Sequence, residues 1–292
     1  MAELWPKISI VTTNYNGAAW LEQTLQSVLG QHYPNLEYIV IDGGSSDGSQ
    51  AIIEKYEIQL SYWESAPDRG FAHAYNKGFA KASGDILAWL NSDDLLTPWA
   101  LETVARCFTD QPQVQWLTSL YPMVAGTSGR TLLMPADPFN RELFFKGVYG
   151  RILPFIQQES TFWRRELWES AGATLDESLE LAIDTELWAR FFKQAELYAV
   201  ASPLGCFRYR TDSKSGRDIS AYYAEMARVL GRYDSGLLSG LLQKRYFPEL
   251  VKRLAPYLSP PRYTGKILNW DRAADRYLAS DERVRFRSPL LG

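Results

Sequence analysis

Cysteine and histidine are scarce in this sequence. Its 292 residues include two cysteines, Cys107 and Cys206, and two histidines, His32 and His73. A disulfide framework needs more cysteines, and a structural zinc site needs about four cysteine or histidine ligands. Neither is expected. The chain should fold around an apolar core, for which its 46% hydrophobic content is sufficient.

The shortage of histidine also argues against a serine hydrolase. The stretch Gly44–Gly48 (GSSDG) matches the G-x-S-x-G pattern of a nucleophile elbow. A catalytic triad of that class needs a histidine well downstream, but His32 precedes the serine and His73 follows too soon. The glycines better suit a tight turn, with Asp47 as a helix cap. A G-x-G-x-x-G turn is also missing, which argues against a nicotinamide dehydrogenase.

Long apolar runs are missing as well. No run approaches the roughly 18 residues that cross a membrane, and no charged-then-apolar signal peptide opens the chain. The expectation is a cytoplasmic enzyme.

Net charge is small, at -3, which argues against a general nucleic-acid binder. The charge is unevenly spread. From Lys244 onward there are 11 basic and 5 acidic residues, about +6, so the preceding part carries 20 basic and 29 acidic residues, about -9.

What the sequence does contain is a repeated strand, turn and helix pattern. Short β-branched runs predict strands, each followed by a polar turn and then by apolar residues at helical spacing. With no hairpin signal between them, these units indicate crossovers and a parallel sheet. The predicted strands are Lys7–Thr13, Leu36–Asp42, Leu60–Glu64 and Ile86–Leu90, with helices around Trp20–Leu29, Ile52–Tyr56 and Ala72–Ala82.

Polar residues follow successive predicted strands. Asn14, Asp42, Asp68 and Asp93 each come just after one. The carboxyl ends of parallel strands share one edge of a sheet, so these side chains are expected to surround a single ligand in one crevice. Taken singly, each is equally typical of a turn.

The run Asn91-Ser92-Asp93-Asp94 lies at the centre of this expectation. Clustered carboxylates after a buried strand suit a hard cation such as Mg²⁺ or Mn²⁺, whose shell is completed by water and substrate phosphates. The alternative is that Asp93 or Asp94 caps a helix starting near Pro98.

Four segments resemble, in order and spacing, the family 2 glycosyltransferases with the GT-A fold. The likeness extends from about Lys7 to about Arg217, and it implies an inverting, metal-dependent transfer from a nucleotide sugar. The segments are Val11–Gly17 (VTTNYNG), Val40–Ser49 (VIDGGSSDGS), Pro67–Gly78 (PDRGFAHAYNKG) and Gly84–Asp94 (GDILAWLNSDD).

The resemblance implies roles for residues of the donor half. Those matching Thr13, Tyr15 and Asp42 contact the nucleoside, and Asp68 with Arg69 holds the base and reaches toward the phosphates. Asn91-Ser92-Asp93 matches the D-x-D motif, with Asn91 in place of the first acid. Asp93 is therefore the implied metal ligand, with Asp94 supporting the sugar or metal site.

Beyond that motif, the chain resembles the acceptor half of the family. Val114–Ser119 and Thr127–Met134 are predicted strands and Arg141–Gly147 a short helix over an acceptor cleft. Gln157–Trp163 and Leu175–Arg190 resemble the family as well.

In Leu175–Arg190 the resemblance implies that Asp184 is the catalytic base. A carboxylate in the first turn of a helix is stabilised as an anion by the helix dipole, although a plain cap has the same pattern. Glu186 is the rival base, expected to point elsewhere.

Phe207–Ser215 (FRYRTDSKS) ends the resemblance. Many relatives carry a histidine where this chain has Arg210. Arg210 or Arg208 is predicted to clamp a phosphate in a forked geometry, and a surface ion pair is the alternative.

Ten tryptophans suggest sugar stacking, although large aromatics are mostly core residues. Trp63, Trp89 and Trp163 lie nearest to the motifs and are the candidates.

Residues from about Ser220 onward are predicted to be helical. Within them, Leu237–Leu258 is basic and amphipathic, interrupted by Pro248 and Pro256. It suits peripheral contact with an anionic membrane carrying a lipid-linked acceptor, and the alternatives are packing on the catalytic domain or a homodimer contact.

The expectation is thus an α/β GT-A domain over residues 1–217, split into a nucleotide-sugar half (1–95) and an acceptor half (96–217), with a C-terminal helical extension (218–292). A UDP-sugar with Mn²⁺ or Mg²⁺ is the implied donor. Two other classes stay open, a nucleotidyltransferase and a catalytically silent binding relative.

Overall fold

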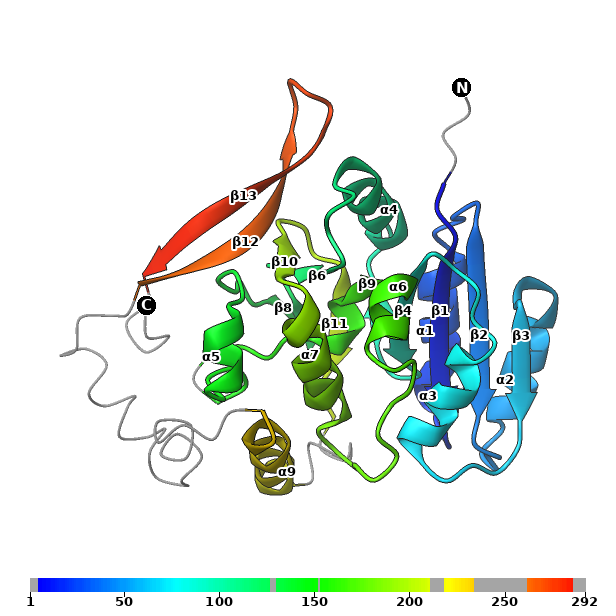
Figure 1. Cartoon of the computed structure of the whole chain (residues 1–292). Helices are drawn as coiled ribbons and strands as arrows, with labels where there is room; N and C mark the ends of the chain where they lie inside the picture. Colours follow the sequence, from blue (N-terminus) through cyan, green and yellow to red (C-terminus); the bar gives the residue numbers. More distant parts are fainter. Residues whose placement is uncertain (1–4, 127–129, 152, 211–217, 234–261, 286–292) are drawn as a thin grey trace.

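Nine strands form the central sheet of the protein (Figure 1). The computed structural model describes residues 5–126, 130–151, 153–210, 218–233 and 262–285. In spatial order the strands are β3 (Tyr62–Ser65), β2 (Leu36–Asp42), β1 (Ile8–Asn14), β4 (Ile86–Asn91), β9 (Phe162–Arg164), β6 (Trp116–Ser119), β10 (Leu197–Val200), β12 (Arg262–Asp271) and β13 (Arg276–Arg285).

The N-terminal part of the sheet is parallel, as predicted. β3, β2, β1 and β4 all run in one direction, and helices connect them. These helices are α1 (Ala18–Leu29), α2 (Ser49–Lys55) with the short η1 (Glu57–Gln59) after it, and α3 (Phe71–Phe79). The predicted strands and helices are confirmed here to within a few residues.

The acceptor half mixes strand directions. β9 is antiparallel to both β4 and β6, and β10 is parallel to β6. A second sheet holds β5 (Leu95–Leu96), β11 (Gly205–Arg208), β7 (Met123–Ala125) and β8 (Thr131–Leu133). The remaining elements are α4 (Ala100–Asp110), α5 (Arg141–Phe145), η2 (Gln158–Ser160), α6 (Arg165–Ser170), α7 (Ile183–Gln194) and α9 (Ile219–Gly231).

Two apolar cores lie on opposite faces of the central sheet. On one face α1 and α4 pack against Ile8 and Ile10 of β1, and on the other α3 and α7 pack over Val11. The alternation along β1 is the period of two that a strand buried on both faces requires.

Trp89 and Trp163 belong to the core and are not sugar platforms. Both are fully buried, with ring centroids 5.8 Å apart, and each packs edge-on against Trp188. Their suggested role in sugar stacking is therefore wrong. Trp63 is half-buried and packs against the other core.

The prediction of a helical C-terminal extension is confirmed for α9 and wrong for residues 262–285. That segment is a hairpin, and β12 continues the central sheet by pairing in parallel with β10. The connecting turn is stabilised by the Asp271 carboxylate, which accepts hydrogen bonds from the N–H groups of Ala273 and Ala274. Leu268 is buried where β12 pairs with β10, and local periodicity does not encode a contact between residues so far apart in the chain.

Residues 237–258, the predicted basic amphipathic helix, lie outside the described residues. In the parts of the chain that the structure describes, no helix combines the length and apolar character needed to cross a bilayer.

Candidate active site

Strand register gathers the predicted donor-side residues. β1 lies between β2 and β4, so that Asn14 is opposite Asp42 and Thr13 is opposite Asn91. Three neighbouring strands therefore present polar side chains at one edge of the sheet. Of the four residues expected to converge, Asn14 and Asp42 are thus neighbours in register, and that they share one ligand with Asp68 and Asp93 stays a prediction.

Asp42 lies beneath this edge and does not open onto it. Its side chain is 0% exposed, and its carboxylate accepts hydrogen bonds from Asn14 Nδ2 (2.7 Å), Ser45 N (2.9 Å), Ser45 Oγ (2.6 Å) and Ser65 Oγ (2.6 Å). Burial acts to raise the pKa of Asp42, but these hydrogen bonds outweigh it and the pKa lies below its usual value. Direct contact between this carboxylate and a nucleoside, as the resemblance implied, does not fit; Asp42 stabilises the turn that follows β2.

Tyr15, Gly43 and Asp68 lie together at the outer end of this edge. Tyr15 is 70% exposed, and a Cβ on Gly43 would lie 2.7 Å from Asp68 Oδ2 and 3.3 Å from Tyr15 Cδ2. Asp68 Oδ1 accepts a hydrogen bond from Gly70 N at 2.7 Å. The absence of a side chain at position 43 thus makes room for the Asp68 carboxylate beside an exposed aromatic ring.

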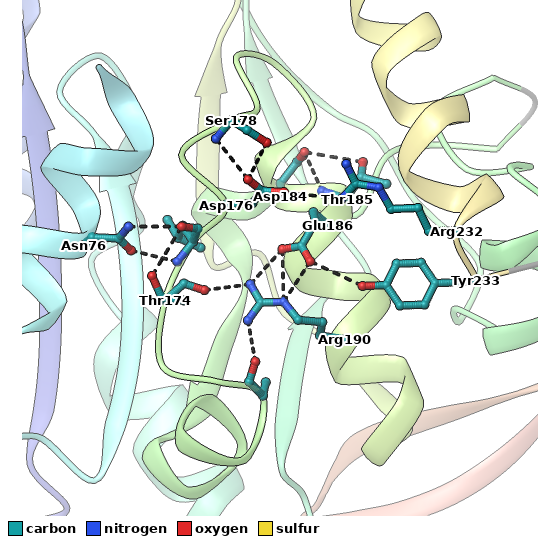
Figure 2. Close-up of polar contacts among 12 residues, drawn as sticks. Asn76, Thr174, Asp176, Ser178, Asp184, Thr185, Glu186, Arg190, Arg232 and Tyr233 are labelled. Carbon is teal, nitrogen blue, oxygen red and sulfur yellow. Dashed lines mark hydrogen bonds and ion pairs between the residues drawn. The ribbon is translucent and has the colours of Figure 1, made fainter. Parts of the chain in front are cut away.

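Arg69 reaches across to the acceptor half. Its Nη2 lies 2.7 Å from Glu177 Oε2, and both side chains are exposed to solvent. Asn76 of α3 holds the same loop, because its Oδ1 accepts from Leu175 N at 2.7 Å and its Nδ2 donates to Glu177 Oε1 at 3.1 Å. Figure 2 shows Asn76 pointing from α3 into this loop.

The loop Asn91–Asp94 is fixed from several sides. Asp94 is fully buried, and its carboxylate accepts from Arg208 N at 2.8 Å and from Asn91 Nδ2 at 3.0 Å. Burial and the charge of Asp93 raise the pKa of Asp94 well above its usual value. Thr24 Oγ1 lies 2.8 Å from the carbonyl oxygens of both Ser92 and Asp94.

Neither aspartate caps a helix. α4 begins at Ala100, its N-cap residue is Trp99, and no side chain caps it. The capping alternative for Asp93 and Asp94 is therefore excluded, which leaves both carboxylates at the sheet edge.

Asp93 carries the more open carboxylate of the pair. Its Oδ2 accepts from Arg210 Nη1 at 3.1 Å, with both side chains partly exposed. Burial raises the pKa of Asp93, and Arg210 opposes that rise. The guanidinium of Arg208 stacks 4.5 Å from the ring centroid of Trp20, with Arg210 at 5.9 Å.

The side chains at this edge decide how a divalent cation could bind. Over the described ranges, no three histidine, cysteine, aspartate or glutamate side chains gather in a way that could hold an ion. A divalent cation bound by one carboxylate and completed by phosphate oxygens and water needs no such cage. Asp93 is partly open and is a carboxylate of the kind that such binding uses, although a cation would compete with Arg210 for it.

Asp184 stands in the first turn of α7, where the sequence placed it (Figure 2). Its Oδ1 accepts from Thr185 N at 2.7 Å, and Tyr222 Oη lies 3.2 Å and 3.3 Å from the two carboxylate oxygens. Burial raises the pKa of Asp184 to about 6, although these hydrogen bonds oppose the rise. The backbone hydrogen bonds at the helix start favour the anion, but desolvation is the larger effect.

Glu186 points away from Asp184, as predicted. Its carboxylate is buried, accepts from Arg190 Nε at 3.0 Å and Nη2 at 2.7 Å, and lies 3.3 Å from Tyr233 Oη (Figure 2). A carboxylate so paired is a structural group.

Glu159 connects the two halves and was missed by sequence reasoning. It is 2% exposed, and its Oε1 has no hydrogen-bond partner among the described residues. Burial, and then the charge of Asp184, raises the pKa of Glu159 to about 8, while the charge of Glu159 in turn raises that of Asp94. Glu159 is thus close to both acids. The quoted segment Gln157–Trp163 contains it, but only burial distinguishes it from an ordinary surface glutamate.

Part of the chain matches a known protein family. Residues 9–167 match the model of glycosyl transferase family 2. An uncharacterized glycosyltransferase of Rickettsia bellii is 33% identical over 256 residues, which cover 86% of this chain and 36% of the relative. One from Mycobacterium tuberculosis is 43% identical over 90 residues, 30% of this chain and 34% of the relative. The matched parts thus span about a third of these relatives.

Solved structures agree on the fold. Staphylococcus aureus TarS 1-349 in complex with UDP-GlcNAc superposes with a TM-score of 0.62 at 16% identity, covering 86% of this chain and 73% of TarS. The mannosyltransferase PcManGT from Pyrobaculum calidifontis, in complex with GDP-Man and Mn²⁺, gives 0.54 at 18% identity, covering 88% and 76%. With a family model that covers more than half of its length and a fold of the GT-A type, this chain belongs to glycosyl transferase family 2.

Proposed function

We propose that this protein is an inverting glycosyltransferase that moves a sugar from a nucleotide-sugar donor to a hydroxyl group of a saccharide or lipid-linked acceptor. The observation that carries the proposal is Asp184. It is a buried carboxylate in the first turn of α7, hydrogen-bonded to Thr185 N and to the Tyr222 hydroxyl, with a pKa of about 6. A general base works best with a pKa near the working pH.

In the proposed reaction Asp184 accepts the proton of the acceptor hydroxyl. The acceptor oxygen forms a bond to the anomeric carbon as the bond from that carbon to the diphosphate oxygen breaks on the opposite face. One base on one face requires no covalent intermediate, so the configuration at the anomeric carbon inverts.

The departing diphosphate carries the charge that the site must stabilise. The guanidinium of Arg69 is exposed and pairs with an exposed glutamate, Glu177, so it can exchange that partner for a phosphate oxygen. Arg210 lies beside Asp93 and is the second candidate. A divalent cation on Asp93 would add positive charge at the same place.

The nucleoside is proposed to lie at Tyr15, Gly43 and Asp68. Tyr15 supplies an exposed ring for stacking, and Asp68 supplies an acceptor oxygen. TarS was solved with UDP-GlcNAc and PcManGT with GDP-Man and Mn²⁺. A uridine donor with Mn²⁺ or Mg²⁺ is the first to test, and thermal stabilisation by a panel of nucleotide sugars would identify the preferred one.

The central test is Asp184→Asn. We expect this variant to bind UDP as the wild type does and to lose transfer by a factor on the order of 10²–10⁴, the usual contribution of a general base. Isothermal calorimetry with and without Mn²⁺ measures binding, and release of UDP from a UDP-sugar measures turnover. Asp281→Asn, at an exposed position on β13, is the matched control and should behave as wild type.

Two results would contradict the proposal. Wild-type transfer by Asp184→Asn would remove the assigned base. Release of pyrophosphate in place of a nucleoside diphosphate would identify attack at phosphorus and hence a nucleotidyltransferase.

A further inference from the structure

Helix α9 follows the residues that the family model covers, and it packs directly on the helix that carries Asp184. α9 spans Ile219–Gly231 and contacts the N-terminal part of α7 (Figure 1). Its buried face consists of Tyr222, Met226, Val229 and Leu230, at the spacing of one helical side. Two polar groups of α9 bind this region. The Tyr222 hydroxyl contacts α7, and the Glu225 carboxylate binds the segment that leads into it.

Tyr222 touches the carboxylate itself. Its hydroxyl lies 3.2 Å and 3.3 Å from the two oxygens of Asp184 and 3.2 Å from Thr185 Oγ1. The tyrosine is buried, and its ring packs edge-on against Phe155, with centroids 5.5 Å apart. The hydroxyl is therefore held in position by its own packing.

Glu225 lies one turn further along α9 and binds the backbone that leads into α7. Its carboxylate accepts hydrogen bonds from the N–H groups of Glu180 (3.2 Å), Leu181 (2.6 Å) and Ala182 (2.8 Å). Burial acts to raise the pKa of Glu225, but these hydrogen bonds prevail and the pKa lies below its usual value. The group is an anion at neutral pH.

α7 has no cap of its own. Its N-cap residue is Ala182, which offers no side-chain acceptor. Backbone N–H groups at a helix start need acceptors and favour negative charge. From a different helix, Glu225 supplies negative charge there and accepts from the N-cap N–H of Ala182 and from the two N–H groups that precede it.

We propose that α9 is a clamp for the catalytic base, in which Tyr222 and Glu225 are positioning residues that hold Asp184 toward the acceptor hydroxyl. The proposal rests on the function proposed above. Tyr222 orients the carboxylate and favours its ionised form, and Glu225 fixes the turn from which it projects. A helix beyond the family-matched residues thereby contributes to the reaction without touching the substrate.

The effect of Tyr222 is measurable as a pH profile. Tyr222 from α9 hydrogen-bonds to Asp184 and lowers its pKa, while burial and the charge of Asp184 raise the pKa of Glu159 from η2. Burial raises the pKa of Asp184, whereas the Tyr222 hydrogen bond lowers it. Without the hydroxyl, the pKa of Asp184 should therefore rise. Tyr222→Phe is expected to move the acidic limb of the kcat profile upward by roughly one pH unit, the shift equivalent to one hydrogen bond to a charged group.

The neighbouring tyrosine provides the control. Tyr223 donates its hydroxyl proton to the carbonyl of Gly150 at 2.7 Å, whereas Tyr222 donates to Asp184. Tyr223→Phe should leave the profile where it is. A Tyr222→Phe profile that superimposes on the wild type would overturn the clamp.

The role of Glu225 is tested by measuring turnover and substrate binding separately. Glu225→Ala should lower kcat on the pH plateau by about 10- to 100-fold, while the Kd for UDP and the KM for the donor stay unchanged. Glu225→Gln keeps one acceptor oxygen and should recover part of the loss, and it also covers the case in which the alanine variant does not fold. Arg228→Ala removes the ion-pair partner of Glu225, 2.8 Å away, and should have little effect.

If Glu225→Ala lost UDP affinity in parallel with kcat, the substitution would have disturbed the whole site, which contradicts a positioning role. A wild-type kcat in Glu225→Ala would contradict that role as well. Failure of the clamp alone is distinguishable from failure of the proposed function. In the first case Asp184→Asn still loses transfer while the α9 variants do not; in the second Asp184→Asn itself remains active.

Discussion

At the scale of single residues, the environment decides what each carboxyl group can do. Asp42 has four hydrogen-bond donors around a buried carboxylate and stays ionised. Asp184 has fewer, and its pKa rises to about 6. Glu159 has an oxygen without a partner, and its pKa rises to about 8. All three carboxyl groups are buried, so the number of hydrogen-bond donors around each accounts for the difference between their pKa values.

The pKa of Asp184 predicts how activity depends on pH. The base must be ionised, so kcat should fall by tenfold per unit below about pH 6 and reach a plateau above it. Initial rates between pH 4.5 and 8 on the wild-type enzyme measure this. A rate that stays constant down to pH 4.5 would contradict a base with this pKa.

Glu159 predicts a gain in stability when its charge is removed. The unfolded chain ionises this group near its usual pKa of 4.5, whereas the folded protein keeps it protonated up to about pH 8. The free energy of unfolding therefore falls as pH rises through that interval. Glu159→Gln should match the wild type near pH 4.5 and exceed it by up to about 4 kcal/mol at pH 8.

Urea unfolding at several pH values measures the Glu159 effect. Glu166→Gln, at an exposed position on α6, is the control and should follow the wild type at each pH. A Glu159→Gln protein that is less stable than the wild type at pH 8 would show that the carboxylate is ionised and paired.

At the scale of elements, the amino ends of the strands are joined by a second polar cluster, opposite the site. Glu37 at the start of β2 accepts from Lys7 Nζ (2.6 Å), Ser9 Oγ (2.5 Å), Ser83 N (2.6 Å) and Ser83 Oγ (2.6 Å). It links β2 to β1 and to the turn before β4. Burial acts to raise the pKa of Glu37, but the hydrogen bonds prevail and lower it to about 2.

Glu37→Gln should therefore destabilise the sheet. Because the folded pKa lies below the usual 4.5, the stabilisation is complete above pH 4.5 and is lost as pH falls toward 2. We expect a loss of about 2–3 kcal/mol at pH 7, with the gap between variant and wild type narrowing below pH 4.5. Chemical denaturation measures the gap, with exposed Glu57→Gln as the control; a gap that does not depend on pH would rule out the ionised group as its source.

Packing between elements is as restrictive as their polar contacts. Gly78 of α3 crosses β1 so closely that a Cβ would lie 2.3 Å from Val11 Cγ1. The glycine is what allows α3 to lie against the sheet and to bring Asn76 to the loop before α7.

At the scale of the whole molecule, the C-terminal hairpin completes the central sheet. Residues 198–200 of β10 pair with 266–268 of β12, and Leu268 is fully buried in the core that also holds Ile8 and Val104. The hairpin is thus an integral part of the fold as described.

Leu268→Ala tests this integration. The substitution should lower the free energy of unfolding by about 2–4 kcal/mol, through lost burial and the cavity left behind. Leu132→Ala on β8 is the matched control, because Leu132 is 62% exposed and should change stability by less than about 0.5 kcal/mol. Equal effects of the two substitutions in a thermal or urea melt would mean that the hairpin does not contribute to the core.

The sequence by itself determined the strand, turn and helix pattern of residues 7–94, the position of Asp93 after a buried strand, and the place of Asp184 at a helix start. These depend on local periodicity and turn chemistry, which neighbouring residues specify. Tertiary structure alone decided that Asp42 is buried, that residues 266–268 pair with β10, and that Glu159 is buried with an oxygen that has no partner among the described residues. Desolvation and strand pairing depend on groups distant in the chain, so no local pattern encodes them.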